Sequence, residues 1–306
     1  MFAVVVLAVL SGLGHPARAG FSTYLSLGDS IAFGETDFTQ DPSFGDRGFV
    51  GHYADFLATL AGGVRPEVVN LAIDGESTSS FFSGAGRNNA GFPDDFVASL
   101  NLNYDPAAIV SQHAKFLSTI ATQAALGNSI DTVTISLGAN DLFLLAGSAA
   151  FQSADAAGKQ ALLLQTLGAI ANNEGALLAE VHALLPGARV FVLGQYNPFP
   201  ADPTHPFAGL AGPAILGLNA TLESLAPAFG ATYVDIYSPF VGREKELTLF
   251  AAPDYNVHPN QAGYSVIAGQ IALASVPEPS SLVLSALALP VVLAWRWGRD
   301  RLRVAA

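Results

Sequence analysis

The sequence predicts an α/β protein whose parallel β-sheet is covered by helices on both faces. Five short apolar runs alternate with stretches whose apolar residues repeat at helical spacing, a pattern typical of βαβ units. The central segment, residues 20–275, has the length of one large domain. Several apolar runs end in Gly, Asn, Asp or Ser, and ligand sites of open α/β sheets lie at such strand ends.

The expected strands are short runs rich in branched and aromatic residues. In chain order they are 23–27 (TYLSL), 67–73 (EVVNLAI), 131–137 (DTVTISL), 188–194 (ARVFVLG) and 231–237 (ATYVDIY). The expected helices have apolar residues three and four positions apart: 49–60, 107–126, 159–185, 214–229 and 262–273. Residues 81–104 interrupt the alternation with a long segment rich in Phe, Gly and Asn. A loop of this length in a compact domain is usually functional or disordered, and here it could form a lid or a substrate wall.

The first 19 residues have the features of a secretory signal peptide. An apolar core (AVVVLAVL) is followed by Ala17-Arg18-Ala19, a small-x-small cleavage site before Gly20. No Lys or Arg precedes the apolar core, which is unusual for a signal peptide. The alternative is a buried N-terminal strand.

Residues 276–306 form a separate C-terminal segment. Pro277-Glu278-Pro279 precedes an apolar run from Leu282 to Trp295, and four arginines follow that run. The run is shorter than the roughly 20 residues of a spanning helix, and the arginines favour a cytoplasmic C-terminus with the body outside. This order of parts resembles the PEP-CTERM sorting signal. The resemblance implies an exosortase-like sorting protease as a partner and transient membrane insertion of the tail. An ordinary C-terminal membrane anchor is the alternative.

Charge and cysteine content restrict the possible partners and chemistry. The body, residues 20–275, contains 8 of the 13 basic and 23 of the 25 acidic residues, which gives a net charge of −15. The charged residues outside it are Arg18, four tail arginines, Glu278 and Asp300. Such an acidic surface argues against nucleic acid as a partner. The chain has no cysteine, which excludes disulfides and thiolate chemistry. A domain of this size needs no disulfides for export.

Small polar residues follow the expected strands at three places and precede the last expected helix at a fourth. They are Gly28-Asp29-Ser30, the stretch NLAIDGES with Gly75, the stretch LGAND with Asn140, and PDYNVHPNQAGY with His258. Each alone is a plausible turn. The chain contains no Walker loop, no G-x-G-x-x-G after a strand, no H-E-x-x-H and no G-x-S-x-G elbow. The spacing of Asp37, Asp41 and Asp46 does not match an EF-hand, and we expect no metal and no organic cofactor.

Together the four blocks resemble the SGNH, or GDSL-type, hydrolase family over roughly residues 22–274. The resemblance implies a flavodoxin-like three-layer α/β/α sandwich with a parallel five-stranded sheet, and an exported serine esterase or lipase. It implies Ser30 as the nucleophile, with oxyanion donors from the N–H groups of Ser30 and Gly75 and the amide of Asn140. An ester carbonyl needs such a nucleophile and such donors. Candidate substrates are acetylated polysaccharide, lipid and small esters.

Two histidines compete for the role of general base. His258 leads directly into the last expected helix, as the final block of the family does. His205 has Asp202 three residues before it, which is the spacing the family uses, but it lies in a Pro-rich loop after the fourth expected strand. We predict His258.

The third member of the triad is less regular. Three residues before His258 stands Tyr255, with Asp254 four and Asn256 two residues before. We predict Asp254, which reaches the imidazole if the loop bulges by one residue, and the alternative is a backbone carbonyl. Because the position of Asp254 departs from the family's spacing, an alternative function remains: a non-catalytic surface or carbohydrate-binding protein that retains the fold.

Overall fold

A computed structural model describes residues 22–36, 47–89, 91–205, 207–251 and 253–276. The predicted signal peptide and C-terminal tail therefore lie outside the described residues, apart from Val276. Within those ranges no helix combines the length and the apolar character needed to cross a bilayer.

The core of the structure is a five-stranded parallel sheet in the order β2-β1-β3-β4-β5. The strands are β1 (Ser22–Gly28), β2 (Glu67–Asn70), β3 (Ser129–Ser136), β4 (Arg189–Leu193) and β5 (Thr232–Val234). The predicted fold class, a parallel sheet between two helical layers, is confirmed. All five predicted strands form, but β2 and β5 are shorter than predicted.

Polar side chains explain both early strand ends. Asn70 accepts a hydrogen bond from Ala72 N–H through Oδ1, at 3.0 Å. Asp235 Oδ1 accepts the N–H groups of Tyr237 and Ser238, at 2.8 and 3.1 Å. Such side chain to backbone bonds compete with strand pairing and turn the chain.

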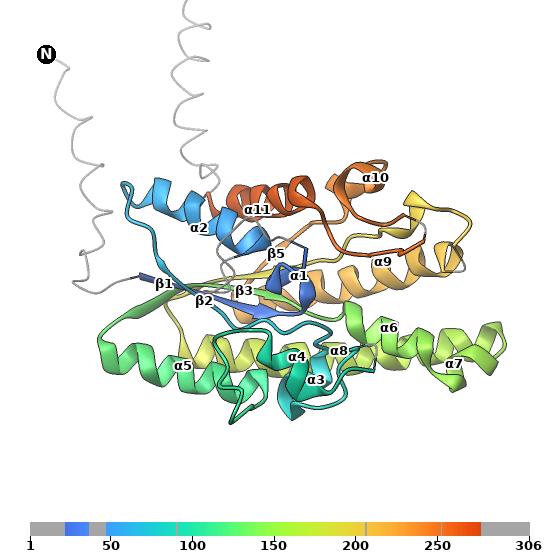
Figure 1. The fold of residues 1–306 in the computed structure, drawn as a ribbon, viewed down its shortest axis with the longest axis horizontal. Helices are drawn as coiled ribbons and strands as arrows, with labels where there is room; N and C mark the ends of the chain where they lie inside the picture. The colour runs from blue at the N-terminus through green and yellow to red at the C-terminus, as the bar shows by residue number, and fades with distance from the viewer. Residues whose placement is uncertain (1–21, 37–46, 90, 206, 252, 277–306) are drawn as a thin grey trace, which may run out of the picture.

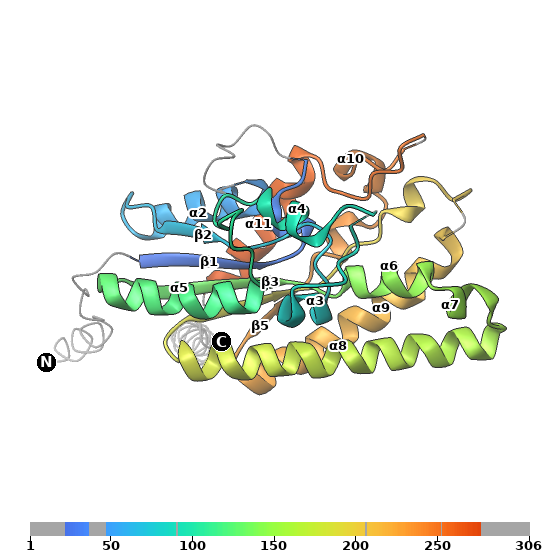
Figure 2. The ribbon, with the colours of Figure 1, turned by 60° about the horizontal axis from the view of Figure 1, so that its bottom comes forward.

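The helices cover both faces of the sheet (Figures 1 and 2). The α-helices are α1 (Ser30–Phe33), α2 (Gly48–Leu60), α3 (Thr78–Ser83), α4 (Asp94–Ser99), α5 (Gln112–Leu126), α6 (Ala139–Gly147), α7 (Ala149–Ser153), α8 (Ala156–Leu184), α9 (Ala208–Leu225), α10 (Glu244–Leu247) and α11 (Gln261–Ser275). The described residues also include short 3₁₀ helices, η2 (Phe199–Ala201), η3 (Ala226–Phe229) and η4 (Ser238–Phe240).

Alternate residues of the strands point to two separate apolar cores. Tyr24 of β1 and Phe191 of β4 pack with residues of α1, α2 and α11. Leu25 and Leu27 of β1 pack on the opposite face, with residues of α5, α8 and α9. A period of two along each strand produces this division.

The segment 81–104 is not one irregular loop. It contains the end of α3 and all of α4, and it is anchored to the sheet. Asn101 Nδ2 donates to the carbonyls of Asn70 and Ala72, and Tyr104 O–H donates to the carbonyl of Leu71, all at 2.8–2.9 Å. The expectation of a loop is therefore corrected: side chains of this segment hold the end of β2.

Candidate active site

Ser30 lies where β1 ends and α1 begins. Asp29 is the N-cap of α1, and its Oδ1 accepts Ile31 N–H at 3.0 Å. Gly28 has φ +153°, and a Cβ there would lie 2.5 Å from the carbonyl oxygen of Ser136 on β3. Gln112 holds the same glycine by accepting its N–H at 2.7 Å and donating to its carbonyl at 2.9 Å. Ser30 is the first residue of the helix, where backbone N–H groups have no helical acceptor.

Gly75 follows β2 in a conformation that only glycine adopts readily. Its φ is +69°, and an added Cβ would meet the carbonyl oxygen of Asn88 at 2.4 Å. The carbonyl of Gly75 accepts Asn88 N–H at 2.8 Å. A side chain at position 75 would push the Asn88 segment away from the end of β2.

Asn140 is the second residue of α6, just past β3, and only 6% of it is exposed. Its Nδ2 donates to the carbonyl of Glu76 at 3.0 Å, and its Oδ1 accepts Asn88 Nδ2 at 2.9 Å. Ile73 N–H donates to the carbonyl of Gly28 at 3.1 Å. Hydrogen bonds therefore connect the three segments that carry Ser30, Gly75 and Asn140.

The loop that carries His258 is fastened to the same region. Tyr196 O–H donates to the carbonyl of Val257 at 2.7 Å, and the Thr36 hydroxyl, six residues after Ser30, donates to the carbonyl of Pro259. Among the described residues, Ser30 Oγ and His258 make no hydrogen bond to each other. Such bonds are often long without substrate and tighten when it binds.

The hydrogen bonds of His258 define the tautomer of its ring. Asn256 Oδ1 lies 3.0 Å from the His258 backbone nitrogen and 2.7 Å from Nδ1. The backbone N–H can only donate, so the Asn256 atom facing it is the oxygen, and Nδ1 must carry the proton. Nε2 then has a free lone pair. Burial lowers the pKa of His258 to about 4, which keeps the ring neutral at physiological pH.

Asp254 does not contact the imidazole. Asp254 is exposed, while Asn256 occupies the position beside Nδ1. Between the two, Tyr255 has φ +46°, a left-handed conformation that is rare outside glycine. With this bend, Asn256 lies at the ring of His258 instead of Asp254. The catalytic role of Asp254 remains a prediction that these contacts do not support.

His205 is held in a different environment. Its ring packs against Phe199, Phe250 and Tyr255, with centroid distances of 5.2, 5.3 and 4.9 Å. Its Nδ1 accepts Phe207 N–H at 3.3 Å, so the proton of the neutral ring lies on Nε2. The carboxylate of Asp202 accepts the N–H and hydroxyl of Thr204, at 3.0 and 2.6 Å. The bonds from Thr204 lower the pKa of Asp202, and His205 adds to the effect. No hydrogen bond joins the side chains of His205 and Asp202 among the described residues, so Asp202 does not orient the ring.

Buried carboxyl groups lie around Ser30 and Asn140. Burial raises the pKa of Asp29 to about 8, and burial raises the pKa of Glu174 on α8 to about 8, with Asp141 and Asp29 adding to the effect. Burial raises the pKa of Asp74, and a hydrogen bond from Gly75 N–H lowers it in part. Asp141 accepts the N–H and hydroxyl of Thr78 at 2.9 and 2.7 Å. The bonds of Asp29 to Ile31 and of Asp141 to Thr78 are those expected of structural polar anchors.

Comparison with known proteins decides the family. The profile of the GDSL-like lipase/acylhydrolase family matches residues 26–266, which include Ser30, Gly75, Asn140 and His258. The chain belongs to this family. It is therefore a carboxylic ester hydrolase of the GDSL type. No protein in the curated set matches the sequence significantly.

Solved structures of GDSL-type and related hydrolases have the same fold. A lipase from a goat rumen metagenome is 22% identical, with a TM-score of 0.55, and the match covers 83% of this chain and 97% of that one. An acetylxylan esterase from Geobacillus stearothermophilus is 17% identical, with a TM-score of 0.51 and coverage of 85% and 97%. An extracellular lipase from Streptomyces rimosus is 16% identical, with a TM-score of 0.51 and coverage of 84% and 100%. At these identities the similarity concerns the fold.

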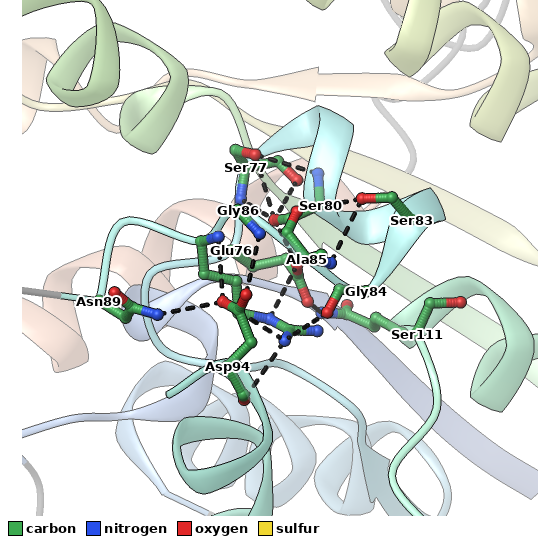
Figure 3. Close-up of polar contacts among 12 residues, drawn as sticks. Glu76, Ser77, Ser80, Ser83, Gly84, Ala85, Gly86, Asn89, Asp94 and Ser111 are labelled. Atoms are coloured by element: carbon green, nitrogen blue, oxygen red, sulfur yellow. Dashed lines mark hydrogen bonds and ion pairs between the residues drawn. The ribbon is translucent and has the colours of Figure 1, made fainter. Parts of the chain in front are cut away.

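Two features of this GDSL-type chain were missed from the sequence. Asn256 and Asn88 are polar residues of irregular loops, and no periodicity distinguishes them from their neighbours. The second feature is a buried ion pair, in which Arg87 Nε lies 3.1 Å from Glu76 Oε1 and both side chains are fully buried. Figure 3 shows the surrounding contacts, with Glu76 and Ser80 beside the turn that carries Asn89 and Asp94. The sequence offered one signal for this ion pair, because Arg87 is a basic residue in an apolar, Gly-rich segment of an acidic chain.

Proposed function

We propose that this protein is an exported serine esterase in which Ser30 attacks the ester carbonyl. His258 Nε2 takes the hydroxyl proton and passes it to the departing alcohol. The same histidine then activates a water that hydrolyses the acyl-enzyme and regenerates Ser30. The N–H group of Ser30 and the side-chain amide of Asn140 stabilise the oxyanion. The N–H of Gly75, which bonds the Asp74 carboxyl group in this structure, joins them when substrate displaces that group. Asn140 Nδ2 carries two hydrogens and gives one to Glu76, so the second is available to substrate.

The observation that carries this proposal is the tautomer of His258. A serine hydroxyl is a weak nucleophile, and it needs a neutral base with a free lone pair close by. His258 is a neutral base with a free lone pair, because its Nδ1 bonds Asn256 and burial lowers the pKa of the ring to about 4. The bond from the Thr36 hydroxyl to the carbonyl of Pro259 ties its loop to the segment that follows Ser30. In His205 the N–H of Phe207 occupies Nδ1 instead.

A fluorophosphonate probe tests the proposal directly, since only an activated serine reacts with it. We expect wild type to be labelled and Ser30→Ala to remain unlabelled. His258→Ala should lose about 10²–10⁴-fold in ester hydrolysis, the usual contribution of general-base catalysis, and His205→Ala should keep most of the activity. An unlabelled wild type would support the rival function, a non-catalytic carbohydrate-binding surface protein. If His205→Ala were the inactive variant, the base would be His205, with Asp202 in the place predicted for Asp254.

The substrate class within this function is an ester of acetylated polysaccharide, lipid or a small alcohol. Both acetylxylan esterase and lipase activities occur among proteins of similar fold. A panel of acetyl and long-chain esters would rank these classes by kcat/KM. A strong preference for acetyl groups would favour polysaccharide, and a preference for long chains would favour lipid.

The proposed route of export rests on the two ends of the chain. Residues 1–19 serve as a signal peptide, and residues 276–306 serve as a sorting segment that an exosortase-like protease removes after transient membrane insertion. The mature protein then lies at the bacterial cell surface or outside the cell. Intact-mass measurement of extracellular protein from the native host should give an N-terminus at Gly20 and a missing tail. A mass that retains both ends would contradict this route.

A further inference from the structure

The candidate oxyanion donor Asn140 has a chemical ambiguity that the protein must resolve. A side-chain amide presents a donor on one side and an acceptor on the other, and a half-turn exchanges them. If Asn140 were turned, its oxygen would point toward the developing oxyanion and repel it. The productive orientation therefore needs partners that recognise each end of the amide.

The side-chain amide of Asn140 is hydrogen-bonded at both its nitrogen and its oxygen. The carbonyl of Glu76 can only accept, and it lies 3.0 Å from Nδ2. On the other side Asn88 Nδ2 donates to Oδ1 at 2.9 Å. Asn88 is also bonded through its own N–H to the carbonyl of Gly75, at 2.8 Å. One residue thus contacts both the segment of Gly75 and the side chain of Asn140.

The segment that carries Asn88 is fixed from both sides. Asp94 accepts the backbone N–H groups of Gly86 and Arg87 at 2.9 and 3.1 Å (Figure 3). The preceding residue, Arg87, forms the buried ion pair with Glu76 and donates to the carbonyl of Gly84 at 3.0 Å. These bonds hold position 88 beside Asn140 before any substrate arrives.

We propose that Asn88 is a positioning residue that locks the side-chain amide of Asn140 in the orientation that donates to the oxyanion. The inference rests on the proposed function, because it assumes that Asn140 is an oxyanion donor. A donor that is already aligned costs no reorganisation in the transition state, and loss of such a donor typically costs about 10²–10³ in rate. Asn88 need not touch the substrate.

Kinetics of two Asn88 variants and one control, with Asn140→Ala as a second background, test this role. Asn88→Leu removes the donor and keeps the size of the side chain, whereas Asn88→Asp replaces the donor with an acceptor that attracts Asn140 Nδ2. We expect Asn88→Leu to lower kcat by about tenfold with KM nearly unchanged, and Asn88→Asp to approach the loss of Asn140→Ala, about 10²-fold or more. The control Asn89→Ala, next in the chain and bonded to Asp94 instead, should stay within about threefold of wild type.

The Asn140→Ala background separates positioning from other effects. If Asn88 acts through Asn140, both Asn88 substitutions should change kcat by less than about twofold once Asn140 is gone. Equal losses in both backgrounds would overturn the proposal, and they would instead indicate a general structural role or, for Asn88→Asp, a direct effect of the new charge. Melting temperatures identify any variant that is merely unfolded.

A measurement without substrate distinguishes failure of this inference from failure of the proposed function. The bond from Asn140 Nδ2 to the Glu76 carbonyl should give a through-hydrogen-bond NMR coupling in wild type and in Asn89→Ala. That coupling should weaken in Asn88→Leu and vanish in Asn88→Asp. An unchanged coupling in Asn88→Asp would overturn the inference even if wild type is a serine esterase. A wild type that shows the coupling but is not labelled by fluorophosphonate would instead contradict the proposed function.

Discussion

At the residue scale, the least usual feature is the amide beside His258. In Ser-His-Asp triads a buried carboxylate holds the imidazole and stabilises the imidazolium that forms during catalysis. Asn256 can hold the ring and define its tautomer, because its oxygen accepts from both the backbone N–H and Nδ1. It brings no negative charge, so the low pKa of His258, about 4, is not compensated.

This difference predicts the effect of Asn256→Asp. A carboxylate beside Nδ1 favours the charged imidazolium and raises the pKa of His258. The acid limb of the kcat/KM profile should move from near pH 4 toward pH 6–7, since a base is inactive below its pKa. At pH 8 we expect kcat to rise about tenfold, because replacing the acid of a triad with its amide costs up to about 10⁴.

Asp254→Asn is the matched control for this pH series. Asp254 is exposed and makes no hydrogen bond to the ring among the described residues, so the pH profile of Asp254→Asn should coincide with that of wild type. If Asp254→Asn moved the acid limb while Asn256→Asp left it in place, the triad predicted from the sequence would be correct and the orientation by Asn256 would be wrong.

At the element scale, α3 and the turn before α4 are joined by buried charge. Glu76 Oε1 contacts Arg87 and accepts Ser80 Oγ at 2.5 Å, and Oε2 accepts Gln112 Nε2 at 3.1 Å. Gln112 in turn holds Gly28, two residues before Ser30. One carboxylate therefore connects β1, α3, α5 and the segment of Asn88.

Removing one partner of the Glu76–Arg87 pair should strongly destabilise the fold. Arg87→Met leaves the Glu76 carboxylate buried without its cation, and we expect a loss of about 3–5 kcal/mol in the free energy of unfolding. Glu76→Gln with Arg87→Met removes both charges and should recover most of that loss. Urea denaturation at pH 7.5 measures both. The exposed pair Arg65–Asp55 supplies the control. Arg65→Ala should lower the free energy of unfolding by less than about 1 kcal/mol. An equal loss in Arg87→Met and Arg65→Ala would mean that Glu76 is solvated.

The elements also show what the sequence could and could not predict. Ser30, Gly75 and Asn140 could be proposed from the sequence because small polar residues directly after apolar runs stand out, and because the four blocks together resemble the family. Asn88 and Asn256 could not be found in this way, because their partners are defined by a turn around Asp94 and by the left-handed Tyr255. Short helices such as α4 were missed because six residues hold too few turns for a period to be recognised.

At the scale of the whole molecule, protonation of buried carboxyl groups reduces the negative charge that the acidic composition gives. The body carries a net charge of −15 by sequence. Burial raises the pKa of Asp29 to about 8 and of Glu35 to about 7, so part of that charge is absent near neutral pH. Protonated acids around Ser30 also weaken the negative field that would oppose an oxyanion.

Glu174 allows this coupling between charge and stability to be measured. It is 1% exposed, and neither carboxylate oxygen has a hydrogen-bond partner among the described residues. Its pKa is about 8 in the folded protein and near 4.5 when the chain unfolds. Between these values the folded state holds the Glu174 proton more tightly than the unfolded state, so the contribution of Glu174 to stability must fall as pH rises from about 5 to about 8. Below about pH 4.5 the contribution of Glu174 is fully present.

Glu174→Gln removes this titration without changing the size of the side chain. The variant and wild type should have similar melting temperatures near pH 5. Above pH 8 the variant should be more stable by a few kcal/mol, and each kcal/mol corresponds to about 2–4 °C in a domain of this size. Glu223→Gln, an exposed position on α9, is the control and should follow the wild-type curve. A constant difference between Glu174→Gln and wild type from pH 5 to pH 9 would contradict the prediction, because it would mean that Glu174 releases its proton at the same pH in the folded and unfolded states.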